Sequence, residues 1–536
     1  MNRSSTTPFS FTVRGILLFF LLGLVPAAVQ LGILWGTRLP LGIPDEWTWA
    51  RSGLGRGDLW NIGPVLLAGT ALCGIVFWGA AICPTASPRK LAVWLIILWM
   101  GGVAWILSTI ASVPGIGGLS RVPFVLFYTR SSGYFTQART EARPLRPFLK
   151  GYRERIADNS QPENYLHLGT HPPGLTTALV GILSLCESSP ALQKVVLATC
   201  PPSVRESFET IAPLTAFDPK PLRTADQAAL WLAAVLIVVL AAGTCLPLFL
   251  LAQRTVSPPA AWWGAAFWLL VPAGAIFFPK SDVLFPCLAM WLQWTWIRGM
   301  ERGRLRDGLL AGTLLFLSIC LTLAFVPIAV ILFLQALVKH GAASGRKNFS
   351  WKSLRVELGT AGMFGFWIVL ADGIGGINLI EVWIQNLRNH AAFYQHATRH
   401  YVAWLLENPV ELGFSLGLPL AGLSACGLVM ICTGSKTLSA SGQPFRQRIF
   451  HHANLLVAVG VWGLLWISGK NMGEAARLWV FLMPYAVWLA MPTIHYIIET
   501  DHFRRWLPAF FLIQMLVCVG TVLGVDGFQF ADLGSP

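Results

Sequence analysis

Long apolar runs recur along the whole chain and constrain its fold more than any other feature. Runs of about 18 residues are long enough to cross a hydrocarbon core about 30 Å thick. A single soluble core cannot absorb so many of them. Only 12% of the 536 residues are charged, roughly half of the fraction in soluble domains. The sequence therefore predicts an all-α polytopic membrane protein with a single membrane domain, residues 1–536.

The apolar runs predict about thirteen transmembrane helices. They cover residues 16–36, 63–83, 92–112, 227–250, 259–279, 283–298, 308–322, 324–338, 355–376, 411–432, 451–468, 477–497 and 506–525. Arg3 and Arg14 precede the first run, as in a signal peptide. However, the run has about 20 residues and lacks a small-x-small cleavage site, which favours an uncleaved first span.

Basic residues gather in short loops on one side of this topology, which indicates the cytoplasmic side. The N-terminus then lies inside and the C-terminus outside, and the net charge of +14 reflects topology rather than nucleic-acid binding. The outer segments are 37–62, a large loop at 113–226, the turn 279–282, the loop 377–410 and the loop 469–476. Within the large loop, residues 173–186 are apolar but too short to span, and they predict an interfacial helix.

The outer segments hold most of the polar residues that suggest chemistry. Asp45 and Glu46 follow the first span, where adjacent carboxylates can act as a general base or simply be solvated. Farther along, the large loop carries an arginine cluster suited to a phosphate or to anionic headgroups. Its members are Arg130, Arg139, Arg143 and Arg146.

Two further outer motifs combine ionisable groups with helix ends. His171 precedes Pro172 and Pro173 at the start of the interfacial helix, where it can hydrogen-bond a substrate hydroxyl or phosphate. Lys280 and Asp282 occupy a very short turn between two spans. There they either anchor the helix ends, pair with each other, or line a polar cavity.

The loop 377–410 carries Glu381, Asn386, His390 and Tyr394 at spacings that share one side of a helix. Such a stripe is either an ordinary solvated face or a sugar-binding surface. Later in the chain, Arg477 begins an apolar helix, where a cation requires a partner. That partner is either Glu474 within the chain or a lipid-linked phosphate.

The ten cysteines show no metal-binding spacing. Most lie in apolar runs, where a cysteine behaves as a small hydrophobe. Cys186 and Cys200 lie in the large loop and can pair if it faces an oxidising compartment.

These motifs together resemble the glycosyltransferase C superfamily, especially the branch of protein O-mannosyltransferases and lipid A aminoarabinose transferases (glycosyltransferase family 39-like). The likeness extends over about residues 37–480. It rests on Asp45-Glu46, on His171-Pro172-Pro173-Gly174, on Val271-Pro272 followed by Lys280-Ser281-Asp282, and on Arg477.

The resemblance implies a glycosyltransferase that passes a sugar from a polyprenyl-phosphate carrier to a lipid or glycan acceptor on the outer face of the bacterial inner membrane. Asp45 or Glu46 would serve as the base of an inverting displacement. Arg477, together with Lys280 or the arginine cluster, would hold the departing phosphate. A lone acidic pair is a poor cage for a divalent ion, so the resemblance leaves the metal requirement open.

One departure from the family pattern concerns the first outer loop, which in the family holds both the acidic pair and the Pro-Pro motif. Here the spans 63–83 and 92–112 separate them. Either a helical hairpin is inserted, or the chain begins with two extra spans. In the second case Gly133-Tyr134-Phe135, which lacks an aspartate, takes the place of the catalytic acid.

Two other function classes use similar features. A lipid flippase or transporter requires charged residues and broken helices at mid-membrane, whereas the predicted spans are nearly free of acids. An oligosaccharide polymerase or ligase also uses lipid-linked sugars and outer-loop arginines. Only the His-Pro-Pro motif and the early acidic pair separate it from the transferase.

Overall fold

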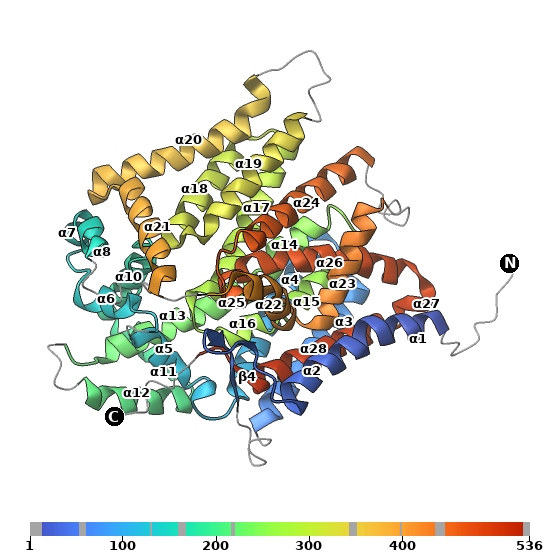
Figure 1. Ribbon diagram of the computed structural model, residues 1–536, viewed down its shortest axis with the longest axis horizontal. Coiled ribbons are helices and arrows are strands. Elements are labelled where there is room, and N and C mark those ends of the chain that lie inside the picture. Colours follow the sequence, from blue (N-terminus) through green and yellow to red (C-terminus); the bar gives the residue numbers. More distant parts are fainter. Residues whose placement is uncertain are drawn as a thin grey trace.

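The computed structural model describes residues 13–52, 61–128, 131–158, 168–215, 220–341, 351–396, 399–434 and 445–528. Over these residues the regular structure is almost entirely helical, with four two-residue strands in two short antiparallel pairs (Figure 1). Ten helices are long and apolar enough to cross a membrane, or up to 12 if each of two bent pairs counts as one span. The all-α polytopic membrane fold is confirmed.

Ten of the thirteen predicted segments coincide with these ten helices. In order, they are α1 (Val13–Phe19) with η1 (Phe20–Leu24) and α2 (Val25–Gly36), α3 (Gly63–Ile82), α4 (Pro88–Ala111), α13 (Thr224–Gly243) with α14 (Cys245–Ala252), α15 (Pro258–Trp268) with α16 (Ala273–Ile276), η5 (Leu323–Phe325) with α19 (Val326–Gly341), α20 (Arg355–Leu370) with η7 (Ala371–Gly375), α24 (Phe445–Ile467), η9 (Val480–Leu482) with α26 (Met483–Glu499), and α28 (Leu507–Gly524).

Two of the remaining segments form helices that are less suited to crossing a bilayer. Segment 283–298 lies in α17 (Phe285–Arg302), whose 18 residues include the charged Arg298, Glu301 and Arg302. Segment 308–322 becomes α18 (Leu305–Leu321), with 17 residues. The two helices pack against each other as a hairpin.

The predicted span at 411–432 is bent. Its residues belong to α22 (Tyr401–Leu416) and α23 (Leu418–Cys432), which meet at an angle of 110°. Gly417 lies at the bend with a φ of +91°, a conformation that favours glycine. The side-chain amide of Gln514 lies 2.3 Å from where a Cβ would stand, so a larger residue would displace it.

Two helices form the centre of the bundle. In the most apolar stretch of Pro258–Ile276, and likewise of Val480–Glu499, 89% is buried inside the structure. The corresponding share for Arg355–Gly375 is 11%. α15 and α26 therefore face other helices on all sides, whereas α20 runs along the edge of the molecule (Figure 1). Both central helices begin with a proline in their first turn, where its missing N–H leaves no intrahelical bond unmade.

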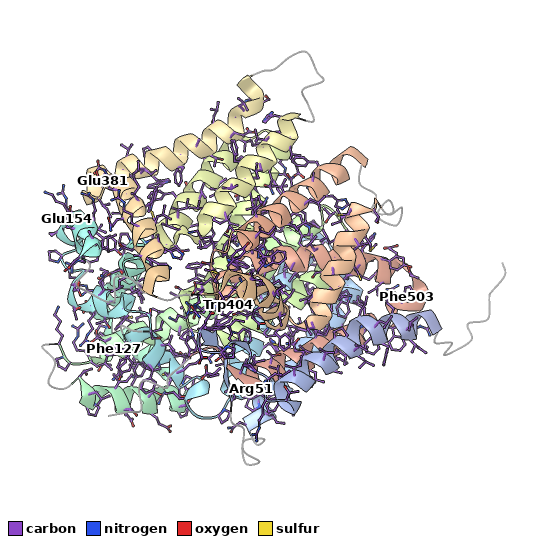
Figure 2. All side chains as sticks on the ribbon, in the orientation of Figure 1. Arg51, Phe127, Glu154, Glu381, Trp404 and Phe503 are labelled. Atoms are coloured by element: carbon purple, nitrogen blue, oxygen red, sulfur yellow. The ribbon has the colours of Figure 1, made fainter. Side chains whose placement is uncertain are left out.

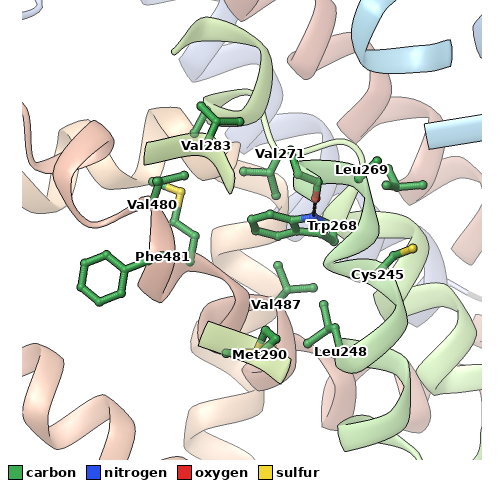
Figure 3. Close-up of a cluster of buried hydrophobic side chains, with 14 of the residues drawn as sticks. Cys245, Leu248, Trp268, Leu269, Val271, Val283, Met290, Val480, Phe481 and Val487 are labelled. Atoms are coloured by element: carbon green, nitrogen blue, oxygen red, sulfur yellow. Dashed lines mark hydrogen bonds between the residues drawn. The ribbon is translucent and has the colours of Figure 1, made fainter. Parts of the chain in front are cut away.

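A buried apolar cluster joins these central helices to two short 3₁₀ segments (Figure 3). Val283 of η4 (Ser281–Leu284) and Val480 of η9 are each 1% exposed and belong to it. The indole of Trp268 donates to the carbonyl of Ala241 at 2.8 Å. Because η4 and η9 pack against each other here, the polar residues that flank them come close together.

The outside of the bundle carries large apolar side chains. Leu67 is 75% exposed and Val369 is 72% exposed. Such side chains on most of the peripheral helices would be unfavourable in water, and lipid tails solvate them.

The large loop at 113–226 is mostly helical. Its helices are α5 (Arg121–Phe127), α6 (Tyr134–Thr140), α7 (Leu145–Lys150), α8 (Tyr152–Ala157), α10 (Gly174–Ser188), α11 (Pro190–Ala198) and α12 (Pro202–Leu214). α10 is the predicted helix at 173–186, and it joins α11 at an angle of 105°. It packs on α13, so the loop lies against the bundle.

Helix α21 (Leu379–His396) packs beside α8 of this loop. Figure 2 shows Glu154 of α8 and Glu381 of α21 at the same edge of the molecule. The sequence left open whether Cys186 and Cys200 pair, and in the structure both are free, buried thiols.

Candidate functional site

The segments that the sequence assigns to the outer face meet at one end of the bundle, called here the loop end. Glu46 contacts Trp404, and Lys280 contacts Ser131. Strand β3 (Ala50–Arg51) pairs with β4 (Val525–Asp526), directly after α28. The C-terminal end of the last span therefore lies at the loop end.

The opposite end of the bundle carries ion pairs among residues of the basic loops. They are Arg254–Glu301, His451–Glu301, Arg298–Asp307, Lys339–Glu357 and His340–Glu357. α15 begins beside this end, and α16, which follows it in the same span, lies at the loop end, where Arg121 donates to the carbonyl of Ala275 at 2.6 Å. The two ends thus differ in composition as the sequence predicts.

Two buried cations lie together at the loop end. Lys280 immediately precedes η4, and Arg477 lies in α25 (Ala475–Leu478), which leads into η9. α25 packs against η4, as does η9. This packing brings together the two cations that the sequence proposed as phosphate ligands, although 197 positions separate them in the chain.

Lys280 is 7% exposed, and its Nζ donates to the backbone carbonyl of Ser131. Burial lowers the pKa of Lys280 to about 7, and the charge of Arg477 adds to this effect. Asp282 and Glu474 act in the opposite direction but do not compensate. The ammonium group thus lacks a neutralising partner strong enough to keep its ordinary pKa.

Arg477 forms an ion pair with Glu474 at 2.9 Å, so the intramolecular partner considered in the sequence is present. Burial lowers the pKa of Arg477, but Glu474, Asp282 and other anionic groups raise it above its ordinary value. The pair does not saturate the guanidinium, because its buried Nε–H has no acceptor among the described residues. An anion that reached this N–H would satisfy it.

Tyr134 follows Ser131, the partner of Lys280, and His171 adjoins Tyr134. The rings of Tyr134 and His171 meet edge to face with centroids 5.9 Å apart. Burial raises the pKa of Tyr134 well above its ordinary value, and the nearby Asp282 raises it further. The phenol therefore remains protonated at neutral pH. Lys280, Asp282, Arg477, Tyr134 and His171 are called the cation cluster below.

Backbone contacts hold His171 in place. Its imidazole Nδ1 lies 3.0 Å from the hydroxyl of Thr170. Its carbonyl accepts from Tyr152 and from the side-chain amide of Asn386, both at 3.0 Å. The predicted site residues His171 and Asn386 are thus in contact, and the two prolines after His171 fix the chain that leads into α10.

The stripe predicted on α21 does not form a single binding face. Asn386 is fully buried, whereas Glu381 is exposed and pairs with Arg153 at 3.3 Å. His390 is half-buried, and burial lowers its pKa despite a hydrogen bond with Asn471. The side chain of Tyr394 lies outside the described residues. Packing against residues 168–171 therefore makes Asn386 a structural group.

The structure separates the two acids of the early pair. Glu46 accepts from the indole of Trp404 at 2.6 Å and from the backbone N–H of His400 at 3.1 Å. Burial raises the pKa of Glu46, but these bonds and a contact with the His400 ring lower it below its ordinary value. Asp45 is exposed in the turn of the hairpin between β1 (Gly42–Ile43) and β2 (Trp47–Thr48), with a φ of +66°.

Glu411 is a site residue that the sequence reasoning missed. It is 6% exposed and accepts from the indole of Trp49 at 3.1 Å and from the backbone N–H of Ala475 at 3.2 Å. It thereby links the segment after the hairpin to the helix that carries Arg477. An acid within an otherwise apolar run was the available signal.

A second missed residue is Arg399. Its guanidinium lies over the Trp404 ring at 5.7 Å and 3.6 Å from the Cβ position of Gly473, in the loop before Arg477. Its buried Nε and Nη1 have no hydrogen-bond acceptor among the described residues. In the sequence, Arg399 was one of many polar residues in a dense segment.

The arginine cluster of the large loop serves other contacts. Arg139 pairs with Asp226 at 3.3 Å, and Arg143 pairs with Glu187. Arg146 is exposed, and Arg130 lies outside the described residues. Two members of the cluster are therefore already neutralised by acids of the protein.

Metal chemistry gains no positive support. Among the described residues, no group of three or more histidine, cysteine, aspartate or glutamate side chains is placed to hold a metal ion.

Comparison with known proteins does not assign a family, since no family model and no curated protein matches the chain.

Proposed function

We propose that the protein is a membrane glycosyltransferase that takes a sugar from a polyprenyl-phosphate donor. The observation that carries this proposal is the pair of buried cations, Lys280 and Arg477, at one end of a bundle of apolar helices. Arg477 retains a buried N–H without an acceptor among the described residues. A lipid-linked phosphate supplies an anion at this depth while its tail stays in the bilayer.

The reaction is an inverting displacement at the anomeric carbon. The acceptor hydroxyl forms a new C1–O bond as the bond from C1 to the phosphate oxygen breaks. The leaving polyprenyl phosphate takes the bonding electron pair, and a carboxylate takes the acceptor's proton. Lys280 and Arg477 stabilise the charge that develops on the phosphate.

We also propose that the protein belongs to the glycosyltransferase C superfamily, which its motifs resemble. The proposal also includes an outward-facing loop end in the bacterial inner membrane, with the N-terminus in the cytoplasm and a lipid or glycan as the acceptor. The loop end fits this assignment because the basic loops lie at the opposite end.

A second candidate function is an oligosaccharide polymerase or ligase that uses a lipid diphosphate. Arg399 favours it, because this third cation also has buried N–H groups without acceptors among the described residues. A diphosphate carries more acceptor oxygens and negative charge than a sugar phosphodiester.

One experiment separates these functions. The purified protein in lipid nanodiscs is incubated with polyprenyl-phosphate monosaccharides or with polyprenyl-diphosphate oligosaccharides, and the released carrier lipid is measured. We expect release from the monophosphate donors. Release from diphosphate donors alone would favour the polymerase or ligase. Scrambling of labelled lipid in vesicles without release would favour a flippase.

The matched variants are Arg477→Ala and Arg505→Ala. Arg505 is an exposed arginine after α26, at the basic end of the bundle. Removing one donor that stabilises transition-state charge lowers turnover by about 10²–10³-fold, so Arg477→Ala should lose turnover while Arg505→Ala keeps it. Wild-type turnover in Arg477→Ala would refute the phosphate-binding role.

A further inference from the structure

We propose that Asp282, rather than either acid of the Asp45-Glu46 pair, is the carboxylate that deprotonates the acceptor hydroxyl. This inference rests on the proposed function and changes the role of Asp282 from phosphate binding to base catalysis. It follows from which carboxylates of the loop end are already hydrogen-bonded and from where the phosphate must lie.

Three acids of the loop end are engaged by the protein. Glu46 accepts from Trp404 and His400, Glu474 pairs with Arg477, and Glu411 accepts from Trp49 and Ala475. The hydrogen bonds to Glu46 lower its pKa and make it a weaker base. Glu411 is 6% exposed and each of its two oxygens already accepts a hydrogen bond, so it presents no free oxygen to a substrate. These three acids therefore hold the structure of the loop end together.

Asp282 is available to a substrate. It is partly exposed, and its side chain has no hydrogen bond or ion pair within the part of the chain that the structure describes. It nevertheless lies close enough to Tyr134, Lys280 and Arg477 to influence the charge state of each. Within the cation cluster, the carboxylate oxygens of Asp282 therefore remain able to accept a hydrogen bond or a proton from a substrate.

The geometry of an inverting transfer requires the base to lie near the phosphate site. The acceptor oxygen approaches to about 3–3.5 Å from C1, and the base lies about 2.6–3.2 Å from that oxygen. The base must therefore lie within roughly 8 Å of the leaving oxygen. Asp282 lies two residues after Lys280, in the η4 segment that packs against the helix of Arg477. Asp45, by contrast, is not among the groups that shift the pKa of either cation.

Other groups of the cluster are poorer bases. The phenol of Tyr134 stays protonated because burial raises its pKa. A bound phosphate anion favours the charged ammonium of Lys280, which then has no lone pair to accept a proton. A carboxylate therefore remains the suitable acceptor of the proton within the cluster.

The test compares two nucleophiles with the variant Asp282→Asn. An alcohol acceptor must lose a proton, but azide attacks C1 without one. It forms a C1–N bond while polyprenyl phosphate departs with its electron pair. We expect Asp282→Asn to lower transfer to the alcohol by about 10²–10⁴-fold, to leave formation of the inverted glycosyl azide within a few fold of wild type, and to bind polyprenyl phosphate as wild type does.

The matched control is Asp372→Asn, which changes an exposed carboxylate in the first turn of η7 without a side-chain partner among the described residues. It should leave both reactions unchanged. Two results would overturn the assignment. One is alcohol transfer by Asp282→Asn within tenfold of wild type, and the other is equal loss of the alcohol and azide reactions.

If Asp282→Asn does not accumulate as a folded protein, Asp282→Glu gives the same ratio. A carboxylate displaced by about 1 Å should lower alcohol transfer by about 100-fold while azide attack persists. Equal effects on the two nucleophiles would again overturn the inference. Failure of the proposed function is distinct, because wild-type protein would then release no polyprenyl phosphate to either nucleophile.

Discussion

Titration of Lys280 tests whether the cation cluster binds a phosphate. Burial and the neighbouring Arg477 lower the pKa of Lys280 to about 7, so about nine-tenths of the amine is charged at pH 6 and about one-tenth at pH 8. A phosphate that binds beside Lys280 favours the charged amine and raises its pKa. Binding of the phosphate is therefore linked to uptake of a proton.

This linkage sets the size of the effect. If the bound amine stays protonated up to pH 8, the affinity for a phosphate ligand falls about tenfold between pH 6 and pH 8, which is about 1.4 kcal/mol. The ligand is a polyprenyl-phosphate sugar, because its phosphodiester does not titrate in this range. Affinity is measured by calorimetry in nanodiscs at fixed ionic strength.

Two variants isolate the contribution of Lys280. Lys280→Arg keeps its charge at both pH values and should bind with little pH dependence. Lys280→Met should bind weakly at both pH values. A wild-type affinity that is equal at pH 6 and pH 8 would refute the argument.

The same pKa makes a prediction for stability without ligand. The pKa of Lys280 in the folded protein lies below its value of about 10.4 in an unfolded chain. The unfolded chain therefore binds more protons between about pH 7 and pH 10, and this residue destabilises the fold most below pH 7. Lys280→Met should accordingly raise the melting temperature more at pH 6 than at pH 9.

Three further predictions concern the framework of the site. Glu46→Gln replaces one of the two acceptor oxygens that His400 and Trp404 share with an NH2 donor, so the melting temperature should fall by a few degrees. Glu381→Gln, at an exposed pair, should not change it, and an equal effect of the two variants would contradict the role of Glu46. Gly417→Ala should destabilise the protein by at least about 2 kcal/mol in denaturant titrations, since its φ is positive and a Cβ would displace Gln514. Gly181→Ala, where a Cβ meets open space, is the control, and equal stability of the two would refute the bend argument. Cys186 and Cys200 should both react with a maleimide after denaturation without reductant, and protection of both would show that they pair.

The apolar pattern was sufficient to predict the fold class and ten of the membrane-crossing helices. This information is local, because about 20 consecutive apolar residues must be helical in a bilayer whatever the rest of the chain does. The same pattern could not reveal the bend at Gly417, since the backbone on either side of it, at Leu416 and Leu420, is hydrogen-bonded by Gln514 of another helix. Glu411 stood out as an acid in an apolar run, but its partners Trp49 and Ala475 lie in distant segments that this pattern does not connect.

The sequence by itself also determined which residue types gather at each end of the bundle. It selected Lys280, Asp282, His171 and Arg477 because charged and polar groups beside apolar runs are rare. Only the tertiary structure decided how they are combined. Contact between η4 and η9 brings Lys280 and Asp282 to Arg477, whereas hydrogen bonds over more than 350 positions commit Glu46 to α22. The physical reason is that the availability of a carboxylate depends on donors contributed by distant segments, and helical spacing along one segment carries no information about them.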